Sequence, residues 1–169
     1  MTYFATQLTP IGPFTTIVDT DDVVLASGWT AEPEDLRPLI HPRIRPTELH
    51  VRTELGNVTR AVAAYHNGAI DAIDDIAVQQ HSGEFLEHAW KILRAVPAGA
   101  PITYSAFAEL SGRPAAVRGA ASACARNAAA LFVPCHRVLR IGGNLGGFRW
   151  GLPAKRWLLD HENAAATRV

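Results

Sequence analysis

The side chains best suited to covalent chemistry are Cys135 and its neighbours His136 and Arg137. A thiolate is the nucleophilic form of cysteine, and a neighbouring imidazole or positive charge favours that form. The apolar residues 131–133 predict a short buried strand, which Pro134 should end because proline fixes φ and donates no hydrogen bond. Cys135 would then lie in a constrained turn. The alternative is an inert core cysteine, which is what most free cysteines are.

Charge is distributed unevenly along a chain whose formal net charge is zero. Residues 1–87 carry thirteen acidic and five basic side chains, so this half is acidic. No acid lies between Glu109 and Asp160, where eight bases stand: Arg113, Arg118, Arg126, Arg137, Arg140, Arg149, Lys155 and Arg156. A segment of one sign suits phosphate binding, as in a nucleic-acid-binding protein. A merely solvated basic face is the alternative.

Four features of the second half follow one pattern. Residues 134–138 read Pro-Cys-His-Arg-Val, Asn127 stands eight residues before the cysteine, and a glycine-rich run fills residues 142–151. The segment 155–162 then ends in Glu162. From about residue 85 to 162 this pattern resembles the O6-alkylguanine-DNA alkyltransferases, which repair methylated guanine. The resemblance implies irreversible transfer of a methyl or alkyl group from guanine O6, with thymine O4 as a further candidate, to the cysteine.

The resemblance also assigns roles around the thiol. His136, oriented by Glu162, would draw the proton from Cys135 through a water, and Asn127 would order the turn around it. Tyr104 matches the phenol that gives a proton to the departing guanine ring, although a core tyrosine at a helix start is the alternative. The thioether product has no carbonyl for water to attack, so the protein should react once.

The target base is inaccessible in stacked DNA and must be flipped out. Arg118, seventeen residues before Cys135, matches the arginine that fills the vacated stack in the family. The other residues expected to contact the duplex are Ala115, Gly119, Arg126 and Arg137. The wall of the base pocket is expected from Pro134, Gly146, Gly147, Phe148, Arg149 and Trp150.

Three positions depart from the family's pattern. The usual Arg-Ala-Val-Gly reads Arg-Gly-Ala-Ala at residues 118–121, and glycine costs roughly 1 kcal/mol of helix stability relative to alanine. Ala128 stands where proline is common, and Phe148 replaces a common tyrosine, which removes a hydroxyl from the glycine-rich run. Cys124 is expected to be structural.

Runs rich in β-branched and aromatic residues predict an antiparallel meander in the first half. Its strands are expected at residues 3–8, 14–19 and 23–29. Four prolines among charges predict an irregular connection over residues 31–56. Asn57 could cap a helix that reaches His66, and residues 69–78 could form a further strand.

The second half reads as helical. Ser82 is expected to cap a helix with one apolar stripe, and Thr103 to cap a short helix over residues 104–110. Pro114 suits the first position of a further helix that ends near Asn127. Two short helices joined by a glycine-containing turn are a helix-turn-helix pattern. The small residues of the second helix permit close approach either to another helix or, as in the family, to the DNA minor groove.

These patterns predict an α/β protein of two domains. Residues 1–81 would form a strand-containing scaffold, RNase H-like by the resemblance. Residues 82–169 would form a helical domain with a winged-helix-like helix-turn-helix, which binds DNA and carries the chemistry.

Composition supports an ordinary soluble protein: of 169 residues, 48% are hydrophobic and 19% are charged. No apolar run approaches the ~20 residues of a membrane span, and the start lacks the features of a signal peptide. The two cysteines, Cys124 and Cys135, make neither a disulfide framework nor the paired spacing of a zinc site. We therefore expect a cytoplasmic monomer that needs no membrane, metal or cofactor; cooperative binding along DNA stays open.

Three rival classes remain. A catalytically silent alkyltransferase-like protein would bind the lesion without reacting, but such relatives usually lack the cysteine. A cysteine hydrolase would turn over repeatedly and would not need a basic helix-turn-helix. A transcription regulator would use that helix without thiol chemistry.

Overall fold

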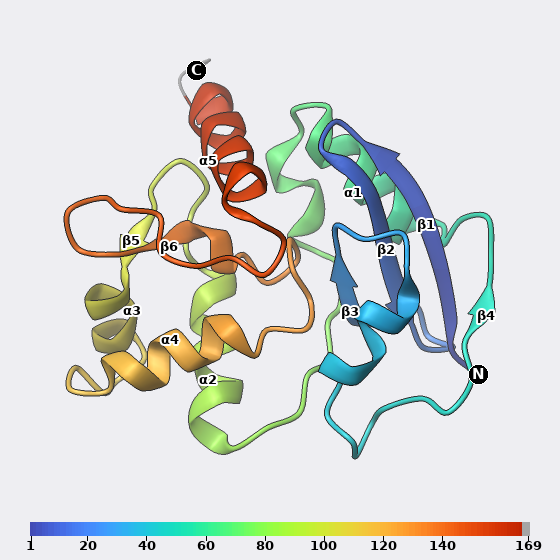
Figure 1. Cartoon of the computed structure of the whole chain (residues 1–169), viewed down its shortest axis with the longest axis horizontal. Helices are drawn as coiled ribbons and strands as arrows, with labels where there is room; N and C mark the ends of the chain where they lie inside the picture. Colours follow the sequence, from blue (N-terminus) through green and yellow to red (C-terminus); the bar gives the residue numbers. More distant parts are fainter. Residues whose placement is uncertain (167–169) are drawn as a thin grey trace. The chain divides into compact units, whose positions relative to one another are not determined.

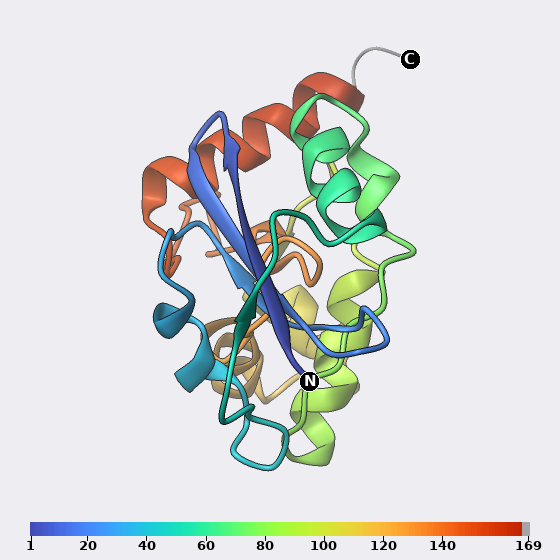
Figure 2. The same ribbon diagram turned by 90° about the vertical axis from the view of Figure 1, so that its right-hand side faces the viewer.

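β-branched and aromatic residues near the N-terminus form a four-stranded sheet in the computed structural model, which describes residues 1–166 (Figure 1). The strands are β1 (Tyr3–Thr9), β2 (Gly12–Val18), β3 (Val24–Gly28) and β4 (His50–Val51). Their order is β3-β2-β1-β4, with β2 antiparallel to β1 and β3, and β4 parallel to β1. The turned view shows β1 and β2 as one long hairpin (Figure 2). The predicted meander is therefore confirmed.

Helix α1 (Asn57–His66) lies against β1 and closes the core of this sheet. Its His66 joins an aromatic cluster, in which the ring centroid of Phe14 lies 5.0 Å from that of Trp29 and 6.2 Å from that of His66. Such edge-on ring contacts add specific geometry to apolar burial. The predicted helix over residues 57–66 is confirmed, with Gly56 at the N-cap position where Asn57 is expected.

The expected strand over residues 69–78 is wrong. Ile70–Ile73 form a 3-10 helix, η3, which satisfies its backbone groups within a local turn instead of a strand ladder. Val78 makes an isolated parallel bridge with Val24. The connection predicted as irregular contains two short 3-10 helices, η1 (Pro33–Asp35) and η2 (Arg37–Leu39), and β4.

The chain divides into two units, and the division crosses the sequence more than once. Unit 1 comprises Met1–His81 and Ala128–Phe132; unit 2 comprises Ser82–Asn127 and the residues from Val133. The segment Ala128–Phe132 lies inside the range predicted for the second domain. Its backbone nevertheless pairs with β3, because Ser27 N donates to Ala128 O at 2.8 Å and Ser27 Oγ to Ala130 O at 2.7 Å.

Residues 131–133 do not form the predicted strand. Leu131 has a φ of 78°, which lies in the left-handed region and interrupts extended backbone. Two residues earlier, Ala129 makes an isolated bridge with Ser27 of β3. The constrained turn predicted after Val133 must therefore be held by other contacts.

Unit 2 is mainly helical. Its elements are α2 (Glu84–Arg94), β5 (Ile102–Thr103), α3 (Tyr104–Leu110), α4 (Val117–Ala125), the 3-10 helix η4 (Cys135–Arg137), β6 (Val138–Leu139) and α5 (Leu152–Ala166). β5 and β6 pair in parallel, and α2, α3 and α4 pack on one another (Figure 1). Among residues 1–166, no helix has the length and apolar character needed to cross a membrane.

The helix starts of unit 2 test the predicted caps. Thr103 caps α3 as predicted, because its Oγ1 accepts from Ala106 N at 3.1 Å. Ser82 does not cap α2, which begins one residue later than a Ser82 cap would place it, after Gly83. Pro114 does not begin α4, because a turn closed by Ala116 N donating to Arg113 O at 2.8 Å comes first.

Small residues of α4 serve its packing on α2. Trp90 Nε1 donates to Ala123 O at 2.9 Å, which brings the indole ring directly against the α4 backbone. A Cβ at Gly119 would lie 3.0 Å from Phe85 Cε2, closer than ordinary contact allows. The departure from the family's usual alanine at this position therefore has a local reason, since glycine leaves room for the phenylalanine.

Candidate active site

Cys135 lies at a sharp turn held by two hydrogen bonds to one carbonyl. Val133 O accepts from Cys135 N at 2.8 Å, and Pro134 has φ −83° and ψ 65°, the geometry of an inverse γ-turn. The same oxygen accepts from Asn127 Nδ2 at 2.7 Å. Asn127, which follows α4, thereby ties the end of that helix to the turn. Cys135 is 9% exposed, so its thiol is nearly enclosed.

Burial raises the pKa of the Cys135 thiol above its ordinary value. Four interactions oppose that rise in pKa: a hydrogen bond from Asn127, the positive charge of Lys155, a backbone hydrogen bond at Cys135 and the positive charge of Arg149. The raised pKa leaves the resting thiol protonated at neutral pH. A base must therefore remove the proton before the sulfur attacks.

His136, the residue after Cys135, forms a buried pair with Glu162. His136 Nε2 lies 2.8 Å from Glu162 Oε2, and their side chains are 0% and 1% exposed. Burial is the largest influence on the pKa of His136 and lowers it; Glu162 opposes that change, while the positive charges of Arg137 and Lys155 add to it. The net effect is a pKa below the ordinary histidine value of 6.5, so the imidazole is neutral at pH 7. Burial alone would raise the pKa of Glu162, but His136 and Arg137 hold that pKa well below its usual range, so the carboxylate is ionised.

This network assigns the imidazole tautomer. An ionised carboxylate only accepts, so Nε2 of the neutral ring carries the hydrogen and donates it to Glu162. Nδ1 then holds the lone pair. That atom is buried and has no hydrogen-bond partner among the described residues. A buried acceptor that is left open, on the residue that follows a cysteine, can receive a proton directly or through a water.

Arg137 has a different place from the one predicted. Its Nε donates to Glu162 Oε1 and its Nη2 to Glu162 Oε2, both at 2.9 Å, and its Nη1 to Val96 O at 2.8 Å. A bidentate guanidinium of this kind fixes a carboxylate rigidly. Arg137 is 4% exposed, so the expectation that it contacts DNA is wrong. Its charge holds Glu162 ionised instead.

Tyr104 begins α3 and borders the glycine-rich run. A Cβ at Gly146, where φ is +71°, would lie 3.3 Å from both Tyr104 Cε2 and Tyr104 Oη. Burial, followed by the nearby thiols of Cys124 and Cys135, raises the pKa of Tyr104 to about 12. The phenol is therefore protonated at neutral pH and can donate. Its position at the helix start agrees with the sequence, and its hydroxyl faces the loop rather than an apolar core.

Lys155, which the sequence placed in the basic segment and in the segment 155–162, is a buried anchor between the site's elements. It is 0% exposed, and its ammonium donates to Val138 O at 2.9 Å, to Gly147 O at 3.3 Å and to Leu145 O. These contacts join β6, which follows the active-site turn, to the glycine-rich loop. The spacing of Lys155 from Leu158 and Glu162 on α5 is the signal that could have found it, because i, i+3 and i+7 share one helix face.

Several small or basic residues of α4 face outward. Arg118, Ala121 and Ala125 are exposed at helical spacing, and Ala115 and Arg126 are exposed at the two ends. This row is the candidate surface for nucleic acid. Gly119 is half-buried, and Phe85 lies close to the position that its Cβ would take; its contact with DNA stays a prediction.

The residues predicted for the pocket wall lie at different depths. Pro134 is buried in the Cys135 turn; Gly146, Phe148 and Trp150 are half-buried, and Gly147 and Arg149 are exposed. The loop that carries most of them is held by the Lys155 ammonium.

Known proteins with similar sequences belong to one family of methyltransferases. Residues 84–164 match the family model described as "6-O-methylguanine DNA methyltransferase, DNA binding domain". The methylated-DNA--protein-cysteine methyltransferase of Shigella flexneri is 33% identical over 156 residues, which are 91% of this chain and 91% of that protein. The chain belongs to this methyltransferase family. The family resemblance inferred from residues 134–138 is confirmed.

Solved structures of methyltransferases extend the likeness to the whole chain. The O6-methylguanine methyltransferase of Mycobacterium tuberculosis has a TM-score of 0.81 at 26% identity, over 100% of this chain and 97% of that one. The same organism's OGT in complex with DNA has a TM-score of 0.80 at 25% identity, over 96% and 94%. The predicted α/β fold, with an N-terminal strand domain and a C-terminal helical domain, is confirmed.

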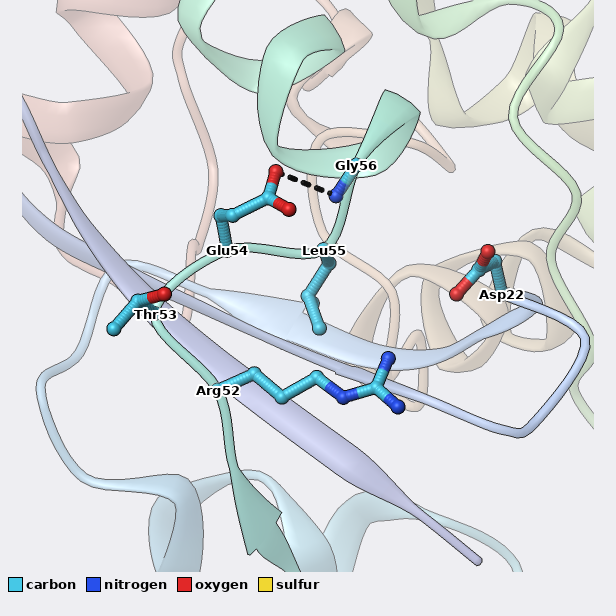
Figure 3. Close-up of a pocket in the computed structure, with 6 residues that line it drawn as sticks. All are labelled: Asp22, Arg52, Thr53, Glu54, Leu55 and Gly56. Atoms are coloured by element: carbon cyan, nitrogen blue, oxygen red, sulfur yellow. Dashed lines mark hydrogen bonds between the residues drawn. The ribbon is translucent and has the colours of Figure 1, made fainter.

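Unit 1 of this methyltransferase has a surface hollow of its own (Figure 3). Its lining residues are Asp22 and residues 52–56. Arg52 Cζ lies 3.5 Å from the centroid of the Tyr3 ring. Glu54 Oε2 accepts from Gly56 N at 2.9 Å (Figure 3). No residue predicted for catalysis lines it, so this hollow has no part in the chemistry described above.

Proposed function

We propose that this chain repairs DNA by moving an alkyl group from O6 of guanine to Cys135 Sγ. The observation that carries the proposal is the buried His136–Glu162 pair, whose imidazole keeps Nδ1 open and directly follows the enclosed Cys135 in the sequence. Membership of the methylated-DNA--protein-cysteine methyltransferase family supports it. The partner is duplex DNA that carries the alkylated base, and the chain acts as a monomer.

The proposed step is a single displacement. The thiol proton passes to His136 Nδ1, through a water as in the family, and the sulfur attacks the alkyl carbon. The Sγ–C bond forms as the C–O6 bond breaks, and the Tyr104 phenol protonates the departing guanine. Glu162 stabilises the imidazolium that forms, and Arg137 keeps Glu162 ionised. No cofactor enters this balance.

The DNA-binding part of the proposal rests on the outer face of α4. Arg118 is exposed there and would fill the space of the flipped base, while Ala115, Ala121 and Ala125 allow close approach to the minor groove. Arg126, at the C-cap, is available to phosphate. The loop over residues 144–151 would then cover the extruded base.

Two rival functions predict different behaviour. A silent lesion-binding relative would need no nucleophile, whereas this chain carries a buried thiol at Cys135 and, in the next residue, an imidazole paired with a buried carboxylate. A cysteine hydrolase would need a product bond that water can break, which a thioether does not offer.

The free thiols Cys124 and Cys135 fit a reducing compartment such as the cytoplasm.

Intact mass after incubation with a duplex that carries one O6-methylguanine tests the proposal. The chain should gain one methyl in place of hydrogen, about 14 Da, the mass of the covalent adduct of a nucleophile. Peptide mapping should place the gain at Cys135, and Cys124→Ala should gain it equally. Cys135→Ala should gain nothing and still bind DNA. A gain on Cys124, or none in the wild type, would overturn the assignment.

A further inference from the structure

Arg149 joins the glycine-rich loop to the end of α4. Its Nη2 donates to Ala125 O at 2.7 Å. Ala125 is the last residue of α4, and the last carbonyls of a helix have no partner within it. One side chain of the proposed pocket wall therefore caps the helix proposed to contact DNA.

The two anchors of the loop differ in character. Lys155 holds the first part, at Leu145 and Gly147, from a fully buried position. The second part, from Phe148 to Gly151, closes on itself, because Gly151 N donates to Phe148 O at 3.1 Å. Arg149 projects from that second part and is exposed. Its bond to Ala125 O therefore competes with water, whereas the Lys155 contacts do not.

The positive charge of Arg149 also acts on the turn that holds Cys135. The C-terminal end of a helix carries a partial negative charge, and α4 leads there to Asn127, which binds the Cys135 turn. A guanidinium at Ala125 O offsets that negative end. Consistently, Arg149 acts to lower the pKa of the Cys135 thiol against the effect of burial.

We propose that Arg149 is a positioning residue that couples contact of α4 with DNA to closure of the loop over residues 144–151. A duplex seated on α4 excludes water from the Ala125 end, and a charge-assisted hydrogen bond strengthens when water is excluded. The loop is then held over the base that the helix has displaced. That the base is an alkylated guanine rests on the proposed function. The coupling between α4 and the loop should operate with any bound duplex, damaged or not.

Amide hydrogen exchange of the loop, followed by mass spectrometry with and without a saturating undamaged duplex, tests the coupling. In the wild type the duplex should slow exchange of residues 144–151 about fivefold, the size of one net hydrogen bond. Arg149→Met should exchange faster when free and should show no slowing with DNA, while Arg149→Lys should recover part of it. Lys91→Met, which removes an exposed charge on α2 of the same unit, is the matched control and should behave as the wild type.

The charge of Arg149 needs a separate readout. The pH dependence of Cys135 modification by iodoacetamide, followed at the Cys135 peptide, reports thiolate formation without DNA. Arg149→Met should move this profile to higher pH, and Arg149→Lys should keep it near the wild type. A loop that slows equally in wild type and Arg149→Met, or an unmoved profile in Arg149→Met, would overturn the inference.

Failure of this inference is distinguishable from failure of the proposed function. A wild type that takes up a methyl group from O6-methylguanine DNA, but whose loop is indifferent to DNA, leaves the function intact and removes the coupling. A wild type that takes up no methyl group refutes the function. The exchange measurement stays readable in that case because it uses an undamaged duplex.

Discussion

His136 Nε2 lies 2.8 Å from Glu162 Oε2, with both side chains out of contact with solvent. The carboxylate fixes which nitrogen carries the hydrogen and so leaves Nδ1 as the base. Arg137 occupies the other side of Glu162 through two hydrogen bonds. One carboxylate thus sets the tautomer of the base and is itself held ionised by a residue adjacent to that base in sequence.

Glu162→Gln should disable proton removal from Cys135. A glutamine can accept from Nε2 but no longer stabilises an imidazolium, and Arg137 loses its counter-charge. We expect single-turnover transfer to slow on the order of 10²–10⁴-fold, the usual contribution of acid–base catalysis. Urea unfolding should show a loss of roughly 3–5 kcal/mol, because one partner of a buried ion pair is removed. Glu84→Gln, at the exposed start of α2, is the control, and a Glu162→Gln rate near the wild type would contradict the assignment.

Stability should fall as pH falls below the ordinary histidine pKa of 6.5. The pKa of His136 in the folded protein lies below that value. At a pH between the folded and the unfolded pKa, the unfolded chain therefore binds more protons, and this binding stabilises it relative to the folded protein. Glu162 acts in the same direction below its ordinary pKa of 4.5. Urea unfolding at several pH values between 7.5 and 5 measures the effect. His136 should contribute up to about 1.4 kcal/mol per pH unit, and His136→Asn should flatten the slope. Equal slopes in both proteins would show that His136 is not buried in its neutral form.

Arg118→Ala should separate base extrusion from chemistry. An exposed arginine that replaces the flipped base matters only when there is a base stack to fill. Because unstacking a base costs a few kcal/mol, repair of duplex DNA should slow on the order of tenfold or more. Reaction with free O6-methylguanine should change little. Tyr104→Phe is the contrasting variant and should slow both reactions, because the leaving guanine needs a proton in either case. Equal losses on both substrates for Arg118→Ala would assign Arg118 to the fold or the pocket instead.

Lys155→Met should loosen the glycine-rich loop and destabilise unit 2. The substitution leaves the carbonyls of Val138, Leu145 and Gly147 without their buried donor, and each unsatisfied carbonyl costs roughly 1–3 kcal/mol unless water reaches it. We expect a lower urea midpoint, and a Cys135 iodoacetamide profile at higher pH because a nearby positive charge is lost. The other lysine of the chain provides the matched control Lys91→Met. A stable Lys155→Met protein with an unchanged profile would show that the ammonium is dispensable.

Local signals in the sequence predicted the helices and the reactive turn well. The Thr103 cap predicted the start of α3, and Pro134 predicted the constrained turn that holds Cys135. The strand expected before that turn was wrong, because Leu131 adopts a left-handed φ and the neighbouring backbone pairs with Ser27, about a hundred residues earlier. Partners so distant in sequence leave no local pattern.

The errors at the site share that cause. Arg137 looks like any other base in a basic segment until Glu162 and Val96 are brought to it from other elements. Lys155 likewise reads as a surface lysine, although its burial is encoded by helical spacing on α5. Gly119 reads as a weak point of a helix until Phe85 is placed against it. Charge and size were visible in the sequence, whereas the distant residues that pack against these side chains were not.

The most direct test is the stoichiometry of transfer with excess O6-methylguanine duplex and no added thiol. A thioether at Cys135 offers water no carbonyl, and His136 and Glu162 are placed to take a proton from a thiol rather than to expel a sulfur-bound alkyl group. Single-use transfer to Cys135 predicts a burst that stops at one methyl group per active chain, with all of the methyl on the peptide that contains Cys135. Repeated turnover, or a plateau with the methyl group on another residue, would contradict it.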